Sequence, residues 1–232
     1  MPSYKLQLLI DQEVLPIIKA AGQRITLAKA VSGTSPNVIW QAIDPFVSTE
    51  VQWEEQYGIY ASTVQMANGA TITKMSETGI PAVDGAYYTF TSATVFAGPF
   101  GGGNVPKGSY RVNNDVPFSA YPVLTFGLTQ TALINQQPFA RKPISATPVL
   151  STQAVMMTPF TSIYIWMQSA SRSETIITQI ISNYSVAKFG GAVTDLVLKY
   201  DPNLGIFVQV LKSAALLRED SELVTLHTNP PH

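Results

Sequence analysis

The chain has 232 residues, no cysteine and a formal net charge of -1 at pH 7, and only 12% of its residues are charged. An ordinary soluble domain has about 25% charged residues, so polar uncharged residues take their place here. This composition excludes a disulfide scaffold, a cysteine-ligated metal site and the large basic surface that nucleic-acid binding requires.

The beginning of the chain predicts a strand and then a short helix. Apolar side chains alternate with more polar ones over residues 4–10, as in a half-buried strand. Asp11 then offers an N-cap oxygen, apolar residues follow at helical spacing, and Gly22 is a suitable stop. We therefore expect a helix between Asp11 and Gly22.

After residue 24 the pattern changes to short β-rich runs separated by turn signals. Asn68-Gly69 predicts a tight hairpin between the runs that flank it, because both residues tolerate positive φ. Residues 196–211 predict a second hairpin, since Pro202 and Gly205 suit the positions of a bulged turn.

Residues 171–187 fit two structures. Ser171 and Glu174 match a capping box, and the isoleucines after them lie at helical spacing. The same isoleucines and threonines favour a strand. Helix and strand both stay open here.

The regular spacing of the strand signals, without alternating helices, predicts a mainly β fold. We expect an antiparallel β-sandwich, two-sheet and jelly-roll-like or internally duplicated, with short helices near the N-terminus and within 171–187. A single domain over 1–232 is the first expectation. The alternative is two related β halves, 1–100 and 115–232, joined by the Gly/Pro-rich loop 98–114.

The residues that carry most enzyme chemistry are scarce. The two histidines, His227 and His232, both lie in the tail, so a serine–histidine triad or a zinc site is not expected. Glu54 and Glu55 are adjacent and would face opposite sides of a strand. We expect no catalytic residue and no cofactor, with a cofactor-free enzyme that uses Asp, Glu or Tyr as an alternative.

Aromatic side chains are numerous for so few charges, and two of them, Trp40 and Trp53, lie in apolar runs that predict core positions. Tyrosine offers an apolar face and a polar tip, which suit a neutral hydroxyl-rich ligand such as a sugar. The candidate ligand-binding residues are Tyr110, Asn113, Asn114 and Asp115, which we expect in loops. We expect no metal site, with calcium on these Asx oxygens as the alternative.

A net charge near zero removes the repulsion that keeps proteins apart, so we expect a homo-oligomer. The function expected is non-enzymatic, most concretely lectin-like binding of a glycan. A second alternative is a pore-forming toxin with 161–188 as the inserting hairpin, and a third is a coat protein of a virus or shell.

We expect no nucleic-acid partner, because the sequence has no large basic patch, and no transmembrane segment, because the apolar runs are short. The first ten residues lack the features of a signal peptide, so we expect a cytoplasmic location, with non-classical release as the alternative.

Overall fold

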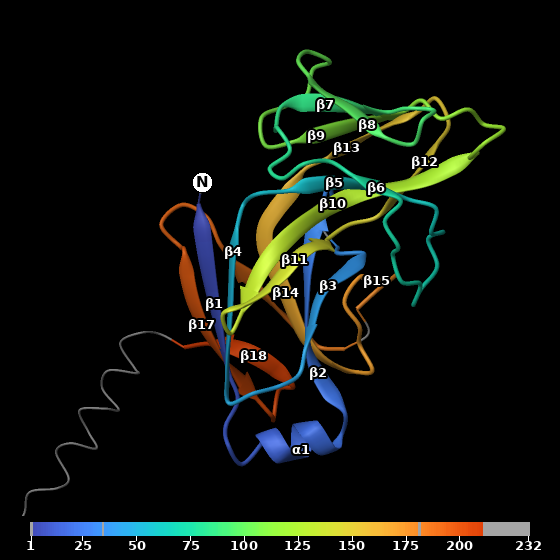
Figure 1. The fold of residues 1–232 in the computed structure, drawn as a ribbon. Helices are drawn as coiled ribbons and strands as arrows, with labels where there is room; N and C mark the ends of the chain where they lie inside the picture. The colour runs from blue at the N-terminus through green and yellow to red at the C-terminus, as the bar shows by residue number, and fades with distance from the viewer. Residues whose placement is uncertain (1, 34, 181, 211–232) are drawn as a thin grey trace, which may run out of the picture.

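The structure, a computed structural model, describes residues 2–33, 35–180 and 182–210 (Figure 1). Within these residues the protein is mainly β, with three sheets and one short helix, and none of the three sheets closes into a barrel. This confirms the mainly β prediction. The described part of the chain also contains no helix of the length and apolarity that a membrane span requires.

The largest sheet has nine strands and contains both ends of the described chain. Its main path runs in the order β18 (Ile206–Gln209), β17 (Asp195–Asp201), β1 (Ser3–Leu9), β4 (Ser48–Glu54), β10 (Val123–Ile134), β5 (Gly58–Ser62) and β6 (Ser76–Glu77). Two further strands pair with the long β10, namely β11 (Gln137–Pro143) and β12 (Thr147–Leu150).

Two smaller sheets complete the fold (Figure 1). The five-stranded sheet has the order β15 (Thr175–Ile176), β3 (Val38–Ile43), β2 (Gln23–Val31), β14 (Pro159–Ser169) and β16 (Tyr184–Lys188). The four-stranded sheet, drawn at the top of Figure 1, has the order β13 (Ala154–Met157), β9 (Tyr110–Asn114), β7 (Ala86–Phe90) and β8 (Phe96–Phe100).

Two of the three sheets contain a parallel pair, which corrects the purely antiparallel prediction, whereas the five-stranded sheet is antiparallel throughout. β1 pairs with β17 in parallel, with Leu6 opposite Leu196, and β7 pairs with β9 in parallel. A parallel pair needs a long crossover connection, and local sequence patterns do not reveal which distant strands it joins. The β1–β17 pair joins strands from opposite ends of the chain.

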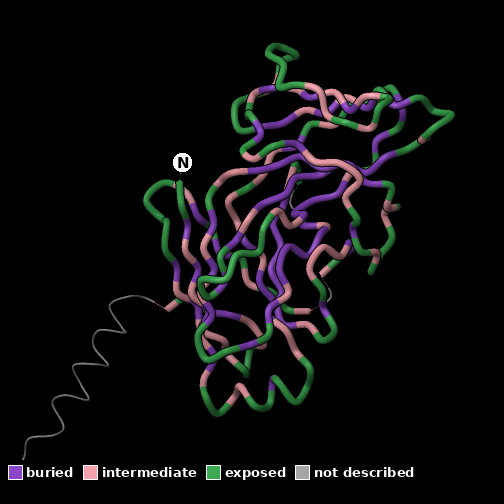
Figure 2. Tube along the Cα trace, in the orientation of Figure 1, coloured by how far each residue is buried: buried purple, intermediate pink, exposed green. Residues whose placement is uncertain are grey.

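Apolar residues alternate with more polar ones along the strands, and the apolar residues form the buried interior (Figure 2). Leu6 and Leu8 of β1 are fully buried, whereas their neighbours are partly exposed, as the period of a strand requires. Trp40 and Trp53 have 0% and 3% of their surface exposed, and their rings meet edge to face at 5.9 Å. The core positions predicted for these two tryptophans are confirmed.

The predicted N-terminal helix is present but short, as α1 (Leu15–Ala20). It begins after a turn in which the Leu15 N–H donates to the Asp11 carbonyl at 3.0 Å. The helix begins later than predicted, with Val14 at its N-cap, so the Asp11 carboxylate does not cap it and instead pairs with Lys199 at 2.8 Å. Gly22 follows the helix at a φ of +63°, which suits its predicted role as a stop.

The described residues of 171–187 contain strands and no helix. Both residues of the expected capping box are engaged elsewhere: Ser171 accepts a hydrogen bond from Thr26 at 2.9 Å, and Glu174 pairs with Lys142. The Ile176 N–H donates to the Ala70 carbonyl at 2.8 Å. Distant partners therefore satisfy this backbone as a strand, which corrects the helix expected here.

The two predicted hairpins have different outcomes. Residues 196–209 do form one, as β17 and β18, with Gly205 at a φ of +69° and the Asp201 carboxylate accepting the Asn203 N–H at 2.8 Å. Leu211, its expected end, lies outside the described residues. At Asn68-Gly69 a turn is present, but its flanks form no ladder with each other, and the Gly69 N–H donates to Ile176 at 2.9 Å.

The long loop expected over 98–114 is shorter than predicted, because β8 and β9 occupy its two ends. Within 161–188, β14 and β16 form an antiparallel pair in which Ile163 lies opposite Ala187. Ile163 and Ile165 are fully buried, so this segment is part of the core in the structure described here.

Candidate functional site

The structure places Tyr110, Asn113 and Asn114 on β9 and not in a loop, whereas Asp115 lies in the connection directly after this strand. Tyr110 is 5% exposed, and its ring meets that of Tyr57 at 5.9 Å. Burial raises the pKa of the Tyr110 hydroxyl well above its ordinary value, and the charge of Asp84 adds to this. The Tyr110 side chain is therefore packed in the core rather than presented to solvent.

The three Asx residues serve different purposes. Asn113 is half-exposed and accepts a hydrogen bond from Arg111 at 3.1 Å. Asn114 is fully buried, where its amide donates to the Val149 carbonyl at 3.1 Å. Asp115 is exposed. Among the four predicted residues, the structure thus offers only Asn113 and Asp115 to a ligand in solution.

A polar network that the sequence did not indicate lies inside the core, around Lys29 of β2. The Lys29 side chain is 0% exposed, and its ammonium donates to Glu55 at 3.1 Å, Tyr57 at 3.2 Å and Gln130 at 2.9 Å. The rings of Trp40, Trp53 and Tyr57 surround it, with centroids at 5.8, 5.7 and 5.3 Å. These rings add cation–π attraction to the charge pair.

Every hydrogen-bond donor of the Lys29 ammonium has a partner within the protein, which indicates a structural role. Three acceptors around Lys29 use all three N–H groups of an ammonium ion. Burial lowers the pKa of Lys29, while the charge of Glu55 and its hydrogen bond oppose that shift. Glu55 also accepts from the Trp53 indole at 3.0 Å and from the Tyr57 hydroxyl. Lys29 thus has no N–H left for a ligand.

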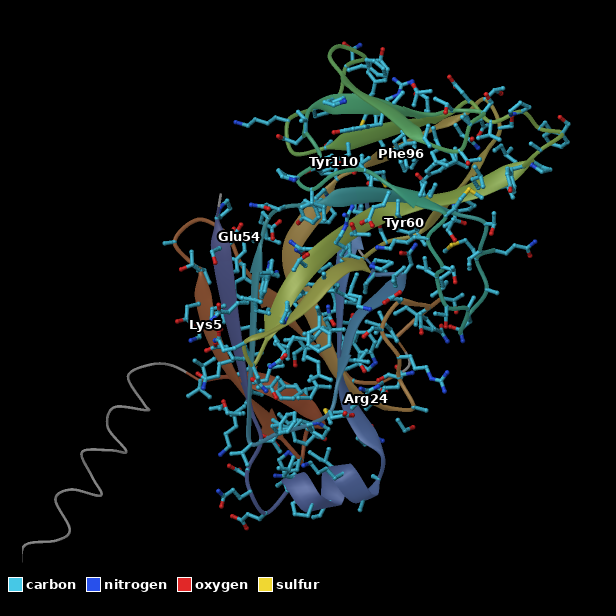
Figure 3. The ribbon with its side chains drawn as sticks, viewed as in Figure 1. Lys5, Arg24, Glu54, Tyr60, Phe96 and Tyr110 are labelled. Carbon is cyan, nitrogen blue, oxygen red and sulfur yellow. The ribbon has the colours of Figure 1, made fainter. Side chains whose placement is uncertain are left out.

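An open depression on the outer face of the nine-stranded sheet has the opposite character. It has a volume of about 380 Å³ and spans β1, β4 and β10, with one wall from the segment after β6. Its lining residues are Ser3, Gln52, Trp53, Glu54, Gln56, Ile80, Thr131, Ala132 and Leu133. Pairing of the three strands fixes their positions, since Glu54 lies opposite Ser3 and Gln52 lies opposite Leu133. Figure 3 shows Glu54 near the upper end of β4.

The chemistry of this depression is polar, with one charge. Glu54 is exposed, and one of its carboxylate oxygens accepts the Gln56 amide at 2.6 Å. Gln52 and Thr131 add an amide and a hydroxyl, whereas Ile80 and Leu133 add apolar surface. The depression therefore combines hydrogen-bonding groups with an apolar wall on rigid strands, as small-molecule sites do.

Glu54 and Glu55 have separate environments, as their adjacency predicts. Glu54 is exposed at the outer depression, while Glu55 joins the buried network of Lys29. The signal for the depression was present in the sequence, because Gln52, Glu54 and Gln56 alternate with apolar Val51 and Trp53. The contribution of β10 was not visible, since it depends on pairing between distant segments.

No group of three or more His, Cys, Asp or Glu side chains that could hold a metal ion occurs among the described residues. Searches for similar proteins also give no family to compare with. No family model matches the chain, and no curated protein or solved structure shows significant similarity to it.

Proposed function

We propose that this protein is a non-enzymatic, lectin-like binding protein that recognises a neutral hydroxyl-rich ligand in the depression around Glu54. The observation that carries the proposal is the lining itself: one exposed carboxylate, two amides and hydroxyl groups beside Ile80 and Leu133. A sugar presents hydroxyl groups at its edge and apolar C–H groups on its face, so it complements both parts of this lining. In fold terms, we describe the two larger sheets as the layers of a β-sandwich.

The volume supports a small ligand. About 380 Å³ lies near the lower end of the range for small-molecule sites, roughly 300–1,000 Å³. One or two sugar rings fit this space, whereas a longer glycan would extend onto the surrounding sheet. Because Glu54 accepts hydrogen bonds and carries a negative charge, ligands rich in hydroxyl donors are favoured over anionic ones.

A glycan array tests this proposal, with the wild-type protein and the variant Glu54→Ala applied at equal concentrations. We expect a saturable, sugar-competed signal from the wild type and at least a tenfold loss with Glu54→Ala, because a charge-assisted hydrogen bond contributes about 1.5–3 kcal/mol. Glu13→Ala is the matched control, since Glu13 is an exposed carboxylate before α1.

Two results would count against the proposal. An array without signal from folded wild-type protein would exclude a carbohydrate ligand. A signal that survives Glu54→Ala but is lost with Asp115→Ala moves the site to the end of β9, where the sequence first indicated it. Recording the solution mass of the same samples tests the expected homo-oligomer.

A further inference from the structure

An exposed apolar tip lies where the chain enters β10, at the end of the molecule opposite α1 (Figure 1). We define the tip as residues 116–123 together with Leu150. Phe118 is 67% exposed, Leu150 48% and Val123 39%. Val123 and Leu150 lie opposite each other in the β10–β12 ladder, and Phe118 lies in the turn that leads into β10. Figure 2 shows this turn as largely exposed.

Hydrogen bonds hold the turn in place, so Phe118 is exposed on an ordered segment. Within the turn, the N–H groups of Ala120 and Tyr121 both donate to the Pro117 carbonyl, at 2.9 and 3.1 Å. Ser151 secures both ends of the turn: its hydroxyl donates to the Val116 carbonyl at 2.6 Å, and its N–H donates to the Pro122 carbonyl at 3.0 Å.

Asn114 provides the second brace, which explains its complete burial. Its amide donates to the Val149 carbonyl at 3.1 Å, and its side-chain oxygen accepts the Val116 N–H at 3.3 Å. Its backbone carbonyl accepts the Thr152 N–H at 2.8 Å. The residue that the sequence suggested as a ligand contact therefore fixes the geometry of the tip.

The tip carries no charge. Residues 116–124 and 147–152, which form and support it, include no Asp, Glu, Lys or Arg. The apolar residues at the opposite end differ, because Lys19 lies over the Phe46 ring at 5.5 Å beside the exposed Ile17. The nearest charge along the chain is the exposed carboxylate of Asp115, directly before the tip. An uncharged tip beside one negative charge matches a surface with no net charge, and it offers nothing to attract an anionic surface.

The area of the tip also restricts its partner. The three large apolar residues of the tip, Phe118, Val123 and Leu150, together expose roughly 300 Å², against about 800 Å² that each partner buries in a stable protein–protein interface. A small apolar tip with an aromatic residue is instead sufficient to enter the interfacial region of a lipid layer, where no complementary surface is needed.

From these observations we propose that the tip docks on a zwitterionic lipid surface, with Phe118 inserted between the headgroups and Val123 and Leu150 beside it. The proposal does not rest on carbohydrate binding, because the depression around Glu54 lies elsewhere on the nine-stranded sheet.

Vesicles of phosphatidylcholine and the variant Phe118→Trp provide the test. The three native tryptophans, Trp40, Trp53 and Trp166, are at most 3% exposed, so an indole introduced at position 118 dominates quenching by acrylamide. We expect vesicles to lower that quenching several-fold. Ile17→Trp is the matched control, since Ile17 is equally exposed at the opposite end, and we expect its quenching to be unchanged.

The same vesicles test the energetic role of Phe118 through Phe118→Ser. We expect the vesicle partition coefficient to fall about tenfold, while the urea midpoint stays that of the wild type because the side chain is exposed. Adding phosphatidylserine should change binding little.

Several results would overturn the proposal. These are unchanged quenching at position 118, equal protection at positions 17 and 118, and binding that requires anionic lipid. Protection of position 118 that depends on protein concentration without vesicles, together with a doubled solution mass, would identify a second copy of the chain as the occupant instead.

Discussion

Replacing Lys29 with methionine removes a buried positive charge and keeps most of the side-chain volume. In the wild type, the Lys29 ammonium donates to Glu55 at 3.1 Å and to Gln130 at 2.9 Å, and the side chain is 0% exposed. In the variant Lys29→Met, Glu55 keeps its hydrogen bonds from Trp53 and Tyr57 but loses its counter-charge.

The expected cost follows from how far the remaining carboxylate is buried. Removing one partner of a buried ion pair destabilises a protein by about 3–5 kcal/mol. Glu55 retains 13% of its side-chain exposure and two hydrogen-bond donors, so we expect the lower end, about 3 kcal/mol. For a chain of this size that corresponds to a fall in Tm of roughly 6–12 °C.

Glu55→Gln gives the complementary comparison. It leaves the ammonium, which is the more deeply buried partner, without a counter-charge, so we expect about 4–5 kcal/mol. The double variant Lys29→Met/Glu55→Gln removes both charges, and it should be more stable than Glu55→Gln alone. Such non-additivity is expected for residues in contact.

Urea unfolding followed by tryptophan fluorescence measures these differences. Trp40 and Trp53 flank Lys29, so their emission reports directly on the network. A loss of less than about 1 kcal/mol in Lys29→Met, or strictly additive effects in the double variant, would refute the interpretation that a charged pair stabilises this core.

Two further predictions concern stability. Gly127→Ala should lower the free energy of unfolding by at least about 3 kcal/mol, because an added Cβ would lie 1.9 Å from the Ser145 carbonyl oxygen. Gly101→Ala, where the added Cβ meets open space, should stay within about 0.5 kcal/mol of the wild type. Equal urea midpoints for the two variants would contradict this. Burial raises the pKa of Tyr57 and Tyr60, so their contribution to stability is complete below about pH 10, the ordinary tyrosine pKa, and is lost above it. Urea midpoints should therefore hold up to about pH 10 and fall as the pH rises above it, less steeply in Tyr60→Phe. An identical pH dependence in both proteins would contradict the burial argument.

Local sequence signals predicted the elements that depend on neighbours in the chain. The turn at 201–205 forms as expected, because the Asp201 carboxylate and Gly205 satisfy it within five residues. The turn at Asn68-Gly69 also forms, but its flanks find partners near Ile176, more than 100 residues away. Turn chemistry fixes a reversal of the chain and does not fix which strands pair.

The candidate site shows the same division. The alternation of Gln52, Glu54 and Gln56 is readable as the polar face of a strand, whereas Thr131 joins them only through the pairing of β4 with β10. The burial of Lys29 was not predictable, since its partners Glu55 and Gln130 are 26 and 101 residues away. A lysine at a strand position is ordinarily solvated, and only the assembled core shows otherwise.

Mapping the ligand by NMR tests the central proposal most directly. The strongest carbohydrate from the array would be titrated into ¹⁵N-labelled protein, and amide shift changes recorded along the chain. We expect the largest changes at Ser3, at residues 52–56 and at residues 131–133, on the three strands that line the depression. Changes concentrated at residues 110–115 instead, or no changes at saturating sugar, would contradict the account.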